Sequence, residues 1–273
     1  MRVYSETKDR IDQRSFWTLF FLLSTSLLLF LSVGHHAKAE ENQHVPQRSP
    51  FQTITLAAED SWPPFANQFG QGISHQLIEA AFKQTQIEVN SLVVPYSRAL
   101  MMAEKGAVDG VFNVTREAST EQRFVFGNTP LFAAKASFYQ RKKLPLIAEN
   151  KWQIPKGSMI GVIKSYEYGD EFPKLVKQRQ LNLVTVATQQ QLINLLLIGR
   201  IDAAVMFDLV AQENLQKMGV SDEVFPAFDN HISQIYLAFS KENPKATLLA
   251  KALDQGLSML KENGQYQQLL KVN

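Results

Sequence analysis

The sequence predicts an α/β protein that is built from two similar units, each with a mostly parallel sheet. Apolar runs of strand length alternate with amphipathic helical stretches from residue 51 to the end of the chain. This order is typical of parallel strands joined by crossover helices. In addition, "AEKGAVDGVFNV" in the first unit resembles "LLIGRIDAAVMF" in the second, because both contain a helix end, Gly, Asp and then a strand. The echo indicates that one α/β unit occurs twice.

The elements of the first unit follow in order from residue 51. "FQTITLAA", "IEVNSLVVP" and "AVDGVFNV" are predicted strands, because they are short, apolar and rich in β-branched residues. "ISHQLIEAAFKQT" is a predicted helix with apolar residues on one face, and "SRALMMAEKG" is a helix ended by Gly106. The βαβαβ order predicts a parallel sheet.

The second unit repeats the pattern. "MIGVIK", "LNLVTVA", "IDAAVMF" and "ISQIYLAFS" are predicted strands. "YGDEFPKLVKQR", "TQQQLINLLLIGR" and "DLVAQENLQKMG" are predicted helices, and Pro173 is tolerated in the first turn of its helix. The chain closes with two amphipathic helices separated around Gly264.

Two crossings between the units are expected. "FAAKASFYQRKKLPLIAENKWQIPKGS" is the first, and the second lies near "QIYLAFS". Because the chain crosses twice, the closing helices return to the first unit. The predicted first lobe is residues 51–136 plus 237–273, and the predicted second lobe is residues 137–236.

The N-terminus is predicted to be a signal peptide that comprises residues 1–39. Basic residues precede an apolar run from Phe16 to Val33, and Ala37 and Ala39 give a signal peptidase pattern with cleavage after Ala39. Residues 40–50 are a polar, disordered lead-in. The run is also near the shortest length that spans a membrane, so an uncleaved anchor is the alternative.

Composition excludes several classes of function. The chain has no cysteine, which excludes disulfides, thiolate metal sites and a cysteine nucleophile. A net charge of +2 with scattered basic residues argues against a nucleic-acid partner. His75 and His231 are far apart in sequence, and neither has ligand-like spacing to an acid. We therefore expect no metal site and no cofactor.

The stretch "EDSWPPFANQFGQG" follows the first predicted strand. Ligands of parallel sheets sit beyond the carboxyl ends of the strands. Pro63 and Pro64 stiffen this loop, so Trp62 and Phe65 would be held out to stack on a small molecule. The alternative is that both aromatic side chains close the end of the core.

Several motifs in order give a family resemblance over residues 51–273. They are "WPPF", "PYSRALMMAEKGAVDG", "REASTEQRFVFGNTPLF", "IGVIKSYEYGDEF", "LLIGRIDAAV" and "ALDQGLSMLKENGQYQQLL". Together they resemble the bacterial extracellular solute-binding proteins of family 3, the polar amino-acid-binding proteins of ABC importers. The resemblance implies a monomeric, two-lobe periplasmic binding protein fold of type II with a two-strand hinge. It also implies an inner-membrane permease as partner.

The resemblance further implies a site for a zwitterion, which needs a cation for its carboxylate and an anion for its ammonium. Arg123 precedes "FVFGNTPL" and is the predicted carboxylate ligand, with Arg116 as the alternative. Asp208 is the predicted ammonium ligand, unless it caps the helix that follows it. Glu59 is the other ammonium candidate, and Trp62 and Phe65 could add cation–π contacts.

Other expected contacts come from small polar and aromatic residues. Asn113 and Thr115 fall where related proteins hold the carboxylate, although either could be an ordinary helix cap. Tyr96 is expected to flank the ligand side chain, and Arg98 in the same turn could face the cleft or solvent. Tyr166 is expected beside a helix N-terminus.

Asp109 and Asp202 belong to the echoed units, and we interpret both as structural turn residues.

The leading hypothesis is a periplasmic protein without enzymatic activity that binds a polar amino acid or a similar zwitterion. One alternative is an enzyme that resembles periplasmic cyclohexadienyl dehydratases, with Glu167 or Glu59 as general acid. A membrane-anchored ligand-sensing module is a further alternative, and it requires residues 16–33 to stay uncleaved.

Overall fold

The computed structural model describes residues 52–271 and contains a nine-stranded sheet. Its long path runs β4 (Ile87–Val94), β1 (Gln52–Glu59), β5 (Gly110–Thr115), β11 (Val224–Ser240), β7 (Phe132–Arg141), β10 (Ala203–Phe207), β8 (Met159–Ile163) and β9 (Asn182–Val186). The short strand β6 (Phe124–Phe126) pairs with β11. The predicted signal peptide, the lead-in and Phe51 lie outside the described residues.

The sheet has two parallel parts. Strands β4, β1 and β5 pair in parallel, and so do β10, β8 and β9. We call the first set, with β6 and its helices, the first half, and the second set with its helices the second half. Strands β5 and β10 are buried throughout, as expected for central strands covered on both faces. The α/β prediction with two similar units is confirmed.

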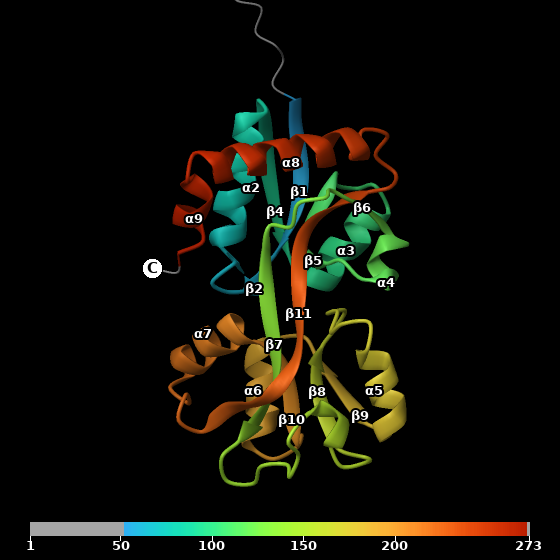
Figure 1. Ribbon diagram of the computed structural model, residues 1–273, viewed down its shortest axis with the longest axis vertical. Coiled ribbons are helices and arrows are strands. Elements are labelled where there is room, and N and C mark those ends of the chain that lie inside the picture. Colours follow the sequence, from blue (N-terminus) through green and yellow to red (C-terminus); the bar gives the residue numbers. More distant parts are fainter. Residues whose placement is uncertain (1–51, 272–273) are drawn as a thin grey trace, which may run out of the picture. The chain divides into compact units, whose positions relative to one another are not determined.

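Helices cover the sheet in both halves (Figure 1). The first half carries α2 (Ile73–Gln84), α3 (Tyr96–Glu104), α4 (Ala118–Glu121), α8 (Ala246–Glu262) and α9 (Gln265–Leu269). The second half carries α5 (Phe172–Arg179), α6 (Gln189–Leu197), α7 (Asp208–Met218) and the short 3-10 turn η1 (Lys151–Gln153). Helices α8 and α9 therefore return to the first half, as predicted, and no helix among residues 52–271 is both long enough and apolar enough to cross a membrane.

Helix α8 packs closely on α2. Gly256 permits this contact, because a Cβ there would lie 2.1 Å from the carbonyl oxygen of Ala81. The amphipathic pattern of both helices predicts burial on one face, but it gives no sign that their backbones approach so closely.

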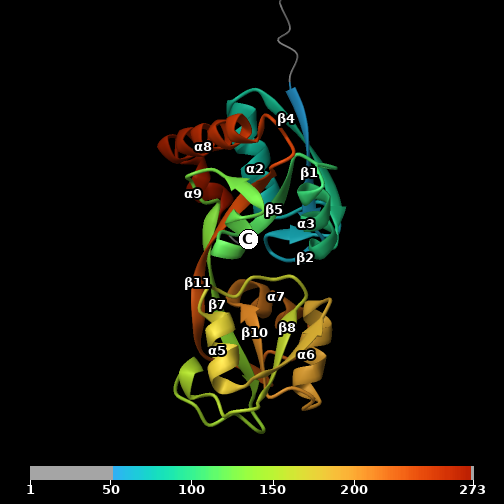
Figure 2. The same ribbon diagram turned by 90° about the vertical axis from the view of Figure 1, so that its right-hand side faces the viewer.

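Strands β7 and β11 run side by side between the halves (Figures 1 and 2). They pair antiparallel from Val224 opposite Arg141 to Ile235 opposite Phe132. Strand β11 continues along β5 in the first half, and β7 pairs with β10 in the second. The two-strand connection expected from the resemblance is thus present, while the lobe boundaries at residues 136/137 and 236/237 stay a prediction.

Strand β11 is longer than the sequence indicates. We predicted a strand over "ISQIYLAFS", but pairing already starts at Val224. The preceding "FPAFDNH" contains Pro, Asp and Asn, which disfavour strands. Register shifts between Pro226 and Phe228, and between Asp229 and His231, accommodate these residues in the ladder.

The echoed turns have the same geometry in both halves. The Asp109 N–H donates to the Thr55 carbonyl (2.8 Å), and Asp109 Oδ2 accepts from the Thr55 N–H (2.7 Å). Asp202 makes the same pair of bonds with Met159, at 2.8 Å each. The structural role predicted for both aspartates is confirmed.

Candidate functional site

Residues from both halves line a cavity of about 10 Å³ at the carboxyl ends of the strands. Glu59, Thr115 and Phe207 are the last residues of β1, β5 and β10. The loop after β8 adds a tyrosine and a glutamate. The full lining is Glu59, Trp62, Tyr96, Asn113, Thr115, Tyr166, Glu167 and Phe207. Ligands of open α/β sheets bind at this edge, so the cavity is the candidate site.

Two tyrosine–glutamate contacts join the halves across the cavity. The Tyr166 hydroxyl of the second half donates to Glu59 Oε2 of the first half at 2.8 Å. In the reverse direction, the Tyr96 hydroxyl of the first half donates to Glu167 Oε2 of the second at 2.9 Å. The two tyrosine rings meet edge to face, with centroids 5.1 Å apart. Each half therefore supplies one hydroxyl donor and one carboxyl acceptor.

Burial changes the acidity of both carboxyls. It raises the pKa of Glu59, which is 1% exposed, to about 8, against the opposing hydrogen bond from Tyr166. Asn113 also opposes this rise, although its Nδ2 forms no hydrogen bond with the described residues. Burial likewise raises the pKa of Glu167 to about 7, against the hydrogen bond from Tyr96. Both carboxyls can therefore hold a proton near neutral pH.

Trp62 and Phe65 are both buried, at 2% and 4% exposure. A cis peptide bond joins Pro63 to Pro64, between the two-residue strands β2 (Ser61–Trp62) and β3 (Ala66–Asn67). The Trp62 ring lies 4.6 Å from that of Phe65 and meets the ring of Phe207 edge-on at 5.1 Å. These rings pack together and do not project from the loop, and their role as ligand contacts stays a prediction. Trp62 still lines the cavity, whereas Phe65 lies outside its lining.

Asn113 and Thr115 both lie within β5, so the alternative that they cap a helix is wrong. Asn113 adopts a left-handed backbone conformation with φ of 58°, which is uncommon for a residue other than glycine. Its Oδ1 accepts a hydrogen bond from Ser74 Oγ at 2.5 Å. Its Nδ2 has no partner among the described residues. Asn113 is part of the cavity lining.

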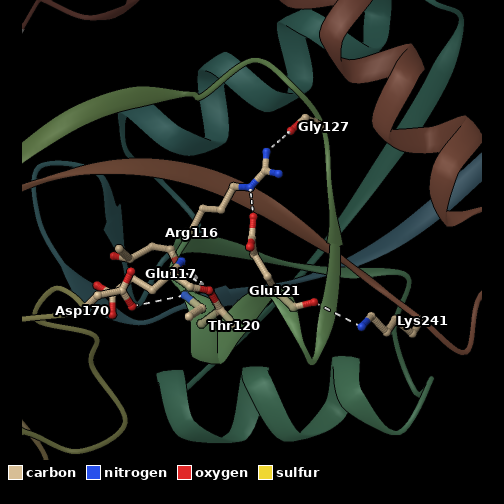
Figure 3. A network of polar contacts seen from close by, with 9 residues as sticks. Arg116, Glu117, Thr120, Glu121, Gly127, Asp170 and Lys241 are labelled. Atoms are coloured by element: carbon tan, nitrogen blue, oxygen red, sulfur yellow. Dashed lines mark hydrogen bonds and ion pairs between the residues drawn. The ribbon is translucent and has the colours of Figure 1, made fainter. Parts of the chain in front are cut away.

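The predicted carboxylate ligands lie outside the cavity lining. The guanidinium of Arg123 pairs with Glu104 and lies over the Phe124 ring at 5.1 Å. Arg116 pairs with Glu121 at 2.6 Å and donates to the Gly127 carbonyl at 3.1 Å (Figure 3). Arg98 is exposed.

No arginine, lysine or histidine lines the cavity within residues 52–271. In this arrangement both candidate arginines already have partners. The role of either as a carboxylate ligand stays a prediction.

Asp208 is also outside the lining. It is the first residue of α7, where no side chain caps the helix, and its Oδ1 accepts from the Tyr139 hydroxyl at 3.1 Å. The structure thus gives Asp208 a different partner from both the ammonium and the helix cap. Its neighbour Phe207 occupies the cavity wall instead.

A second set of contacts joins α4 to the loop between β8 and α5. Glu117 Oε1 accepts from the Gly169 N–H at 2.7 Å, and Asp170 Oδ1 accepts from the Ala118 N–H at 3.2 Å (Figure 3). Burial raises the pKa of Glu117 to about 7. These bonds add to the tyrosine–glutamate contacts between the halves.

Comparison with known proteins identifies the family of this chain. Residues 54–272 match the bacterial extracellular solute-binding proteins, family 3. The chain belongs to this family. Among curated proteins, none matches the chain.

Several solved structures share the fold of this family 3 protein. A histidine kinase sensor domain with similarity to periplasmic binding proteins has a TM-score of 0.70 at 19% identity, covering 81% of this chain and 96% of that one. An ancestral arginine-binding protein bound to arginine has a TM-score of 0.68 at 20% identity, covering 80% and 96%. The ancestral amino acid-binding protein AncCDT-1, a precursor of cyclohexadienyl dehydratase, has a TM-score of 0.64 at 18% identity, covering 80% and 93%. The predicted periplasmic binding protein fold is confirmed.

Sequence reasoning missed Phe207 and gave Glu167 only an enzymatic role. Phe207 ends the apolar run "AAVMF" and looks like any other core residue of that strand. Glu167 follows Tyr166 directly in the loop after β8, so its place beyond a strand end was a usable signal.

This family 3 protein also has a larger, open groove of about 850 Å³. Asp60, Pro63 and Pro95 line it from the first half. In the sequence they are next to the cavity residues Glu59, Trp62 and Tyr96, respectively. Gln189 and Asn214 line it from the second half. The groove has the volume typical of small-molecule sites, whereas the cavity has room for about one water molecule.

Proposed function

We propose that this protein captures a small polar solute with an amino group, an amino acid or a similar zwitterion, between its two halves. One observation carries the proposal. Side chains from the ends of β1, β5, β8 and β10 converge on a single cavity. Six residues predicted as ligand contacts from the sequence are among them, namely Glu59, Trp62, Tyr96, Asn113, Thr115 and Tyr166.

Capture requires the halves to separate. A cavity of about 10 Å³ is far smaller than an amino acid. The tyrosine hydroxyls of Tyr96 and Tyr166 bridge it. Strands β7 and β11 provide the connection about which a hinge motion can open and close the site. The proposal therefore takes the lobes as residues 51–136 plus 237–273 and 137–236.

Delivery to an ABC importer completes the proposed role. The family is described as extracellular, which agrees with export and removal of residues 1–39. In the periplasm, a monomer with closed lobes would dock on an inner-membrane permease.

Thermal-shift screening of the exported protein against the standard amino acids tests the proposal. A ligand at 100 times its Kd adds about 2.7 kcal/mol to the free energy of unfolding. Thr115→Val removes a hydroxyl from the cavity wall and should reduce the shift. Thr53→Val makes the same change at an exposed position of β1 and should not. The proposal fails if no compound raises the melting temperature, or if both variants respond alike.

A second candidate function is that of a dehydratase-like enzyme. Burial gives Glu59 a pKa of about 8 and Glu167 a pKa of about 7, so either could deliver a proton to a leaving hydroxyl near neutral pH. The similarity to AncCDT-1 also favours it. Incubation with prephenate and arogenate tests this enzymatic role. Turnover by the unaltered protein that is lost in Glu167→Gln would support it. If neither compound is consumed, the role is excluded.

A third candidate function is an anchored sensing module, which the similarity to a histidine kinase sensor domain favours. It requires residues 16–33 to remain on the exported protein. The mass of the exported protein tests this, since cleavage predicts an N-terminus at Glu40.

A further inference from the structure

The two carboxyls of the cavity bear on the charge of the captured solute. We infer that Glu59 and Glu167 select a solute of net positive charge, which rests on the proposed function of solute capture. Two cationic nitrogen groups of this solute face the carboxyls, and one oxygen acceptor group faces Trp62 and Asn113. A basic amino acid has this set of groups.

The charge balance of the cavity is the first argument. Its lining holds two carboxyls, and within the described residues it holds no basic side chain. Arg116 and Arg123 are held by Glu121 and Glu104. His231 lies against Phe207, with ring centroids 6.1 Å apart, and its burial together with Lys151 lowers its pKa to about 4.

A neutral zwitterion brings one positive and one negative group to this site. It would therefore leave one carboxyl without a cation, either protonated or ionised and unpaired, whereas a second cationic group would pair with it. Unpaired charge is costly to bury.

Unused acceptor capacity is the second argument. Within the described residues, each of the two carboxyls accepts one tyrosine hydroxyl. An ionised carboxylate has about four acceptor positions, so room remains for a charged donor beside each tyrosine. The walls formed by Trp62 and Phe207 are aromatic, and such faces attract cations.

Two buried donors without hydrogen-bond partners are the third argument. Trp62 Nε1 and Asn113 Nδ2 line the same cavity on side chains that are 2% and 5% exposed. Neither donor has a hydrogen-bond partner among the described residues. Buried donors normally have one. They point to an oxygen acceptor on the solute, which a plain diamine lacks and an α-carboxylate supplies.

Calorimetric titration of the exported protein with matched compounds tests the inference. L-Citrulline has the shape of L-arginine but a neutral side chain, and agmatine has the two cationic groups but no carboxylate. We expect L-arginine to bind about tenfold or more tighter than either. We expect L-glutamate to give no binding heat.

Variants assign the selectivity to its residue. Glu167→Gln should bring the affinity ratio of arginine to citrulline close to one. Glu88→Gln removes an exposed carboxyl from the edge strand β4 and should leave the ratio unchanged. Should Glu167→Gln fail to fold, proton release measured with the unaltered protein replaces it. Arginine titrated at pH 7 in buffers of different ionisation enthalpy should release protons, because a cation favours the ionised carboxyls.

The outcomes distinguish failure of the selectivity from failure of solute capture. If citrulline or glutamine binds as tightly as arginine, or if arginine releases no proton, the inference is overturned while the proposed function stands. If no amino acid binds, the proposed function fails and the inference fails with it.

Discussion

The two halves of the molecule are alike at one end of their strands and unlike at the other. At the turn end, Asp109 and Asp202 make the same pair of backbone hydrogen bonds, to Thr55 and Met159. At the cavity end, the first half presents Glu59 as the last residue of β1, whereas the second presents Tyr166 in the loop after β8.

The difference between the ends separates what folds the unit from what the unit does. Each aspartate holds the start of one strand against a neighbouring strand of its half, β5 against β1 and β10 against β8, so both halves need them. Four cavity residues, Glu59, Tyr96, Tyr166 and Glu167, bond across to the other half, so these residues are free to differ between the halves. The comparison predicts that changes at the turn end act on stability alone, while changes at the cavity end act on pH dependence and binding.

The largest expected effect is a pH dependence that comes from the cavity end. The pKa of Glu59 is about 8 in the folded protein against an ordinary 4.5, so the folded state holds a proton that the unfolded chain has released. Its contribution is therefore fully present below pH 4.5 and is lost as the pH rises through 8, by up to about 1.4 kcal/mol per pH unit. Glu59→Gln should flatten this decline in denaturant titrations between pH 5 and 8. If stability declined with pH as steeply in Glu59→Gln as in the unaltered protein, the raised pKa of the buried Glu59 carboxyl would be contradicted.

Next in size is the loss of a turn aspartate. Asp202→Ala leaves the Met159 N–H without its partner and should lower the free energy of unfolding by about 1–2 kcal/mol. Asp109→Ala should cost more, about 2–3 kcal/mol, because Asp109 also accepts from Asn243 Nδ2 at 2.7 Å. Urea titration measures both. Ligand affinity should not change, and a loss of affinity in either variant would break the separation of the two ends.

The contacts between the halves come third. Tyr166→Phe and Tyr96→Phe each remove one hydroxyl donor from a cavity carboxyl. Each should lower the free energy of unfolding of the unliganded protein by about 1–2 kcal/mol, which is measured as a lower melting temperature. Because the two bonds are reciprocal and differ by only 0.1 Å in length (2.8 and 2.9 Å), the losses should be similar. A loss in one variant only would show that the halves do not depend equally on these bonds.

The smallest effect concerns backbone strain at the cavity end. Asn113 and Ser165 both have positive φ, at 58° and 65°. Ser165 is exposed, so Ser165→Gly should stabilise the protein by about 0.5–1 kcal/mol. Asn113→Gly relieves similar strain but removes the bond from Ser74, so we expect no net gain. If Asn113→Gly raised the free energy of unfolding as much as Ser165→Gly does, the hydrogen bond from Ser74 would contribute nothing to stability.

The sequence predicts the turn end better than the cavity end. Asp109 and Asp202 follow Gly in an echoed pattern, so local chemistry indicates their role. The cavity residues come from the ends of five strands, β1, β4, β5, β8 and β10, and the rule for parallel sheets brings six of the nine predicted contacts together. Arg123 and Asp208 lie outside the lining and contact Glu104 and Tyr139 instead, and no local sequence pattern indicates these partners.

Closure of the halves on a solute is the central claim, and a distance measurement between them tests it most directly. Lys83 on α2 and Lys177 on α5 are exposed. Because the chain has no cysteine, spin labels react only at the cysteines introduced by Lys83→Cys and Lys177→Cys. In the protein alone, electron–electron resonance should give a broad distance distribution from open and closed forms. The compound with the largest thermal shift in the amino-acid panel should narrow it to one closed distance. An identical distribution with and without that compound would contradict the account.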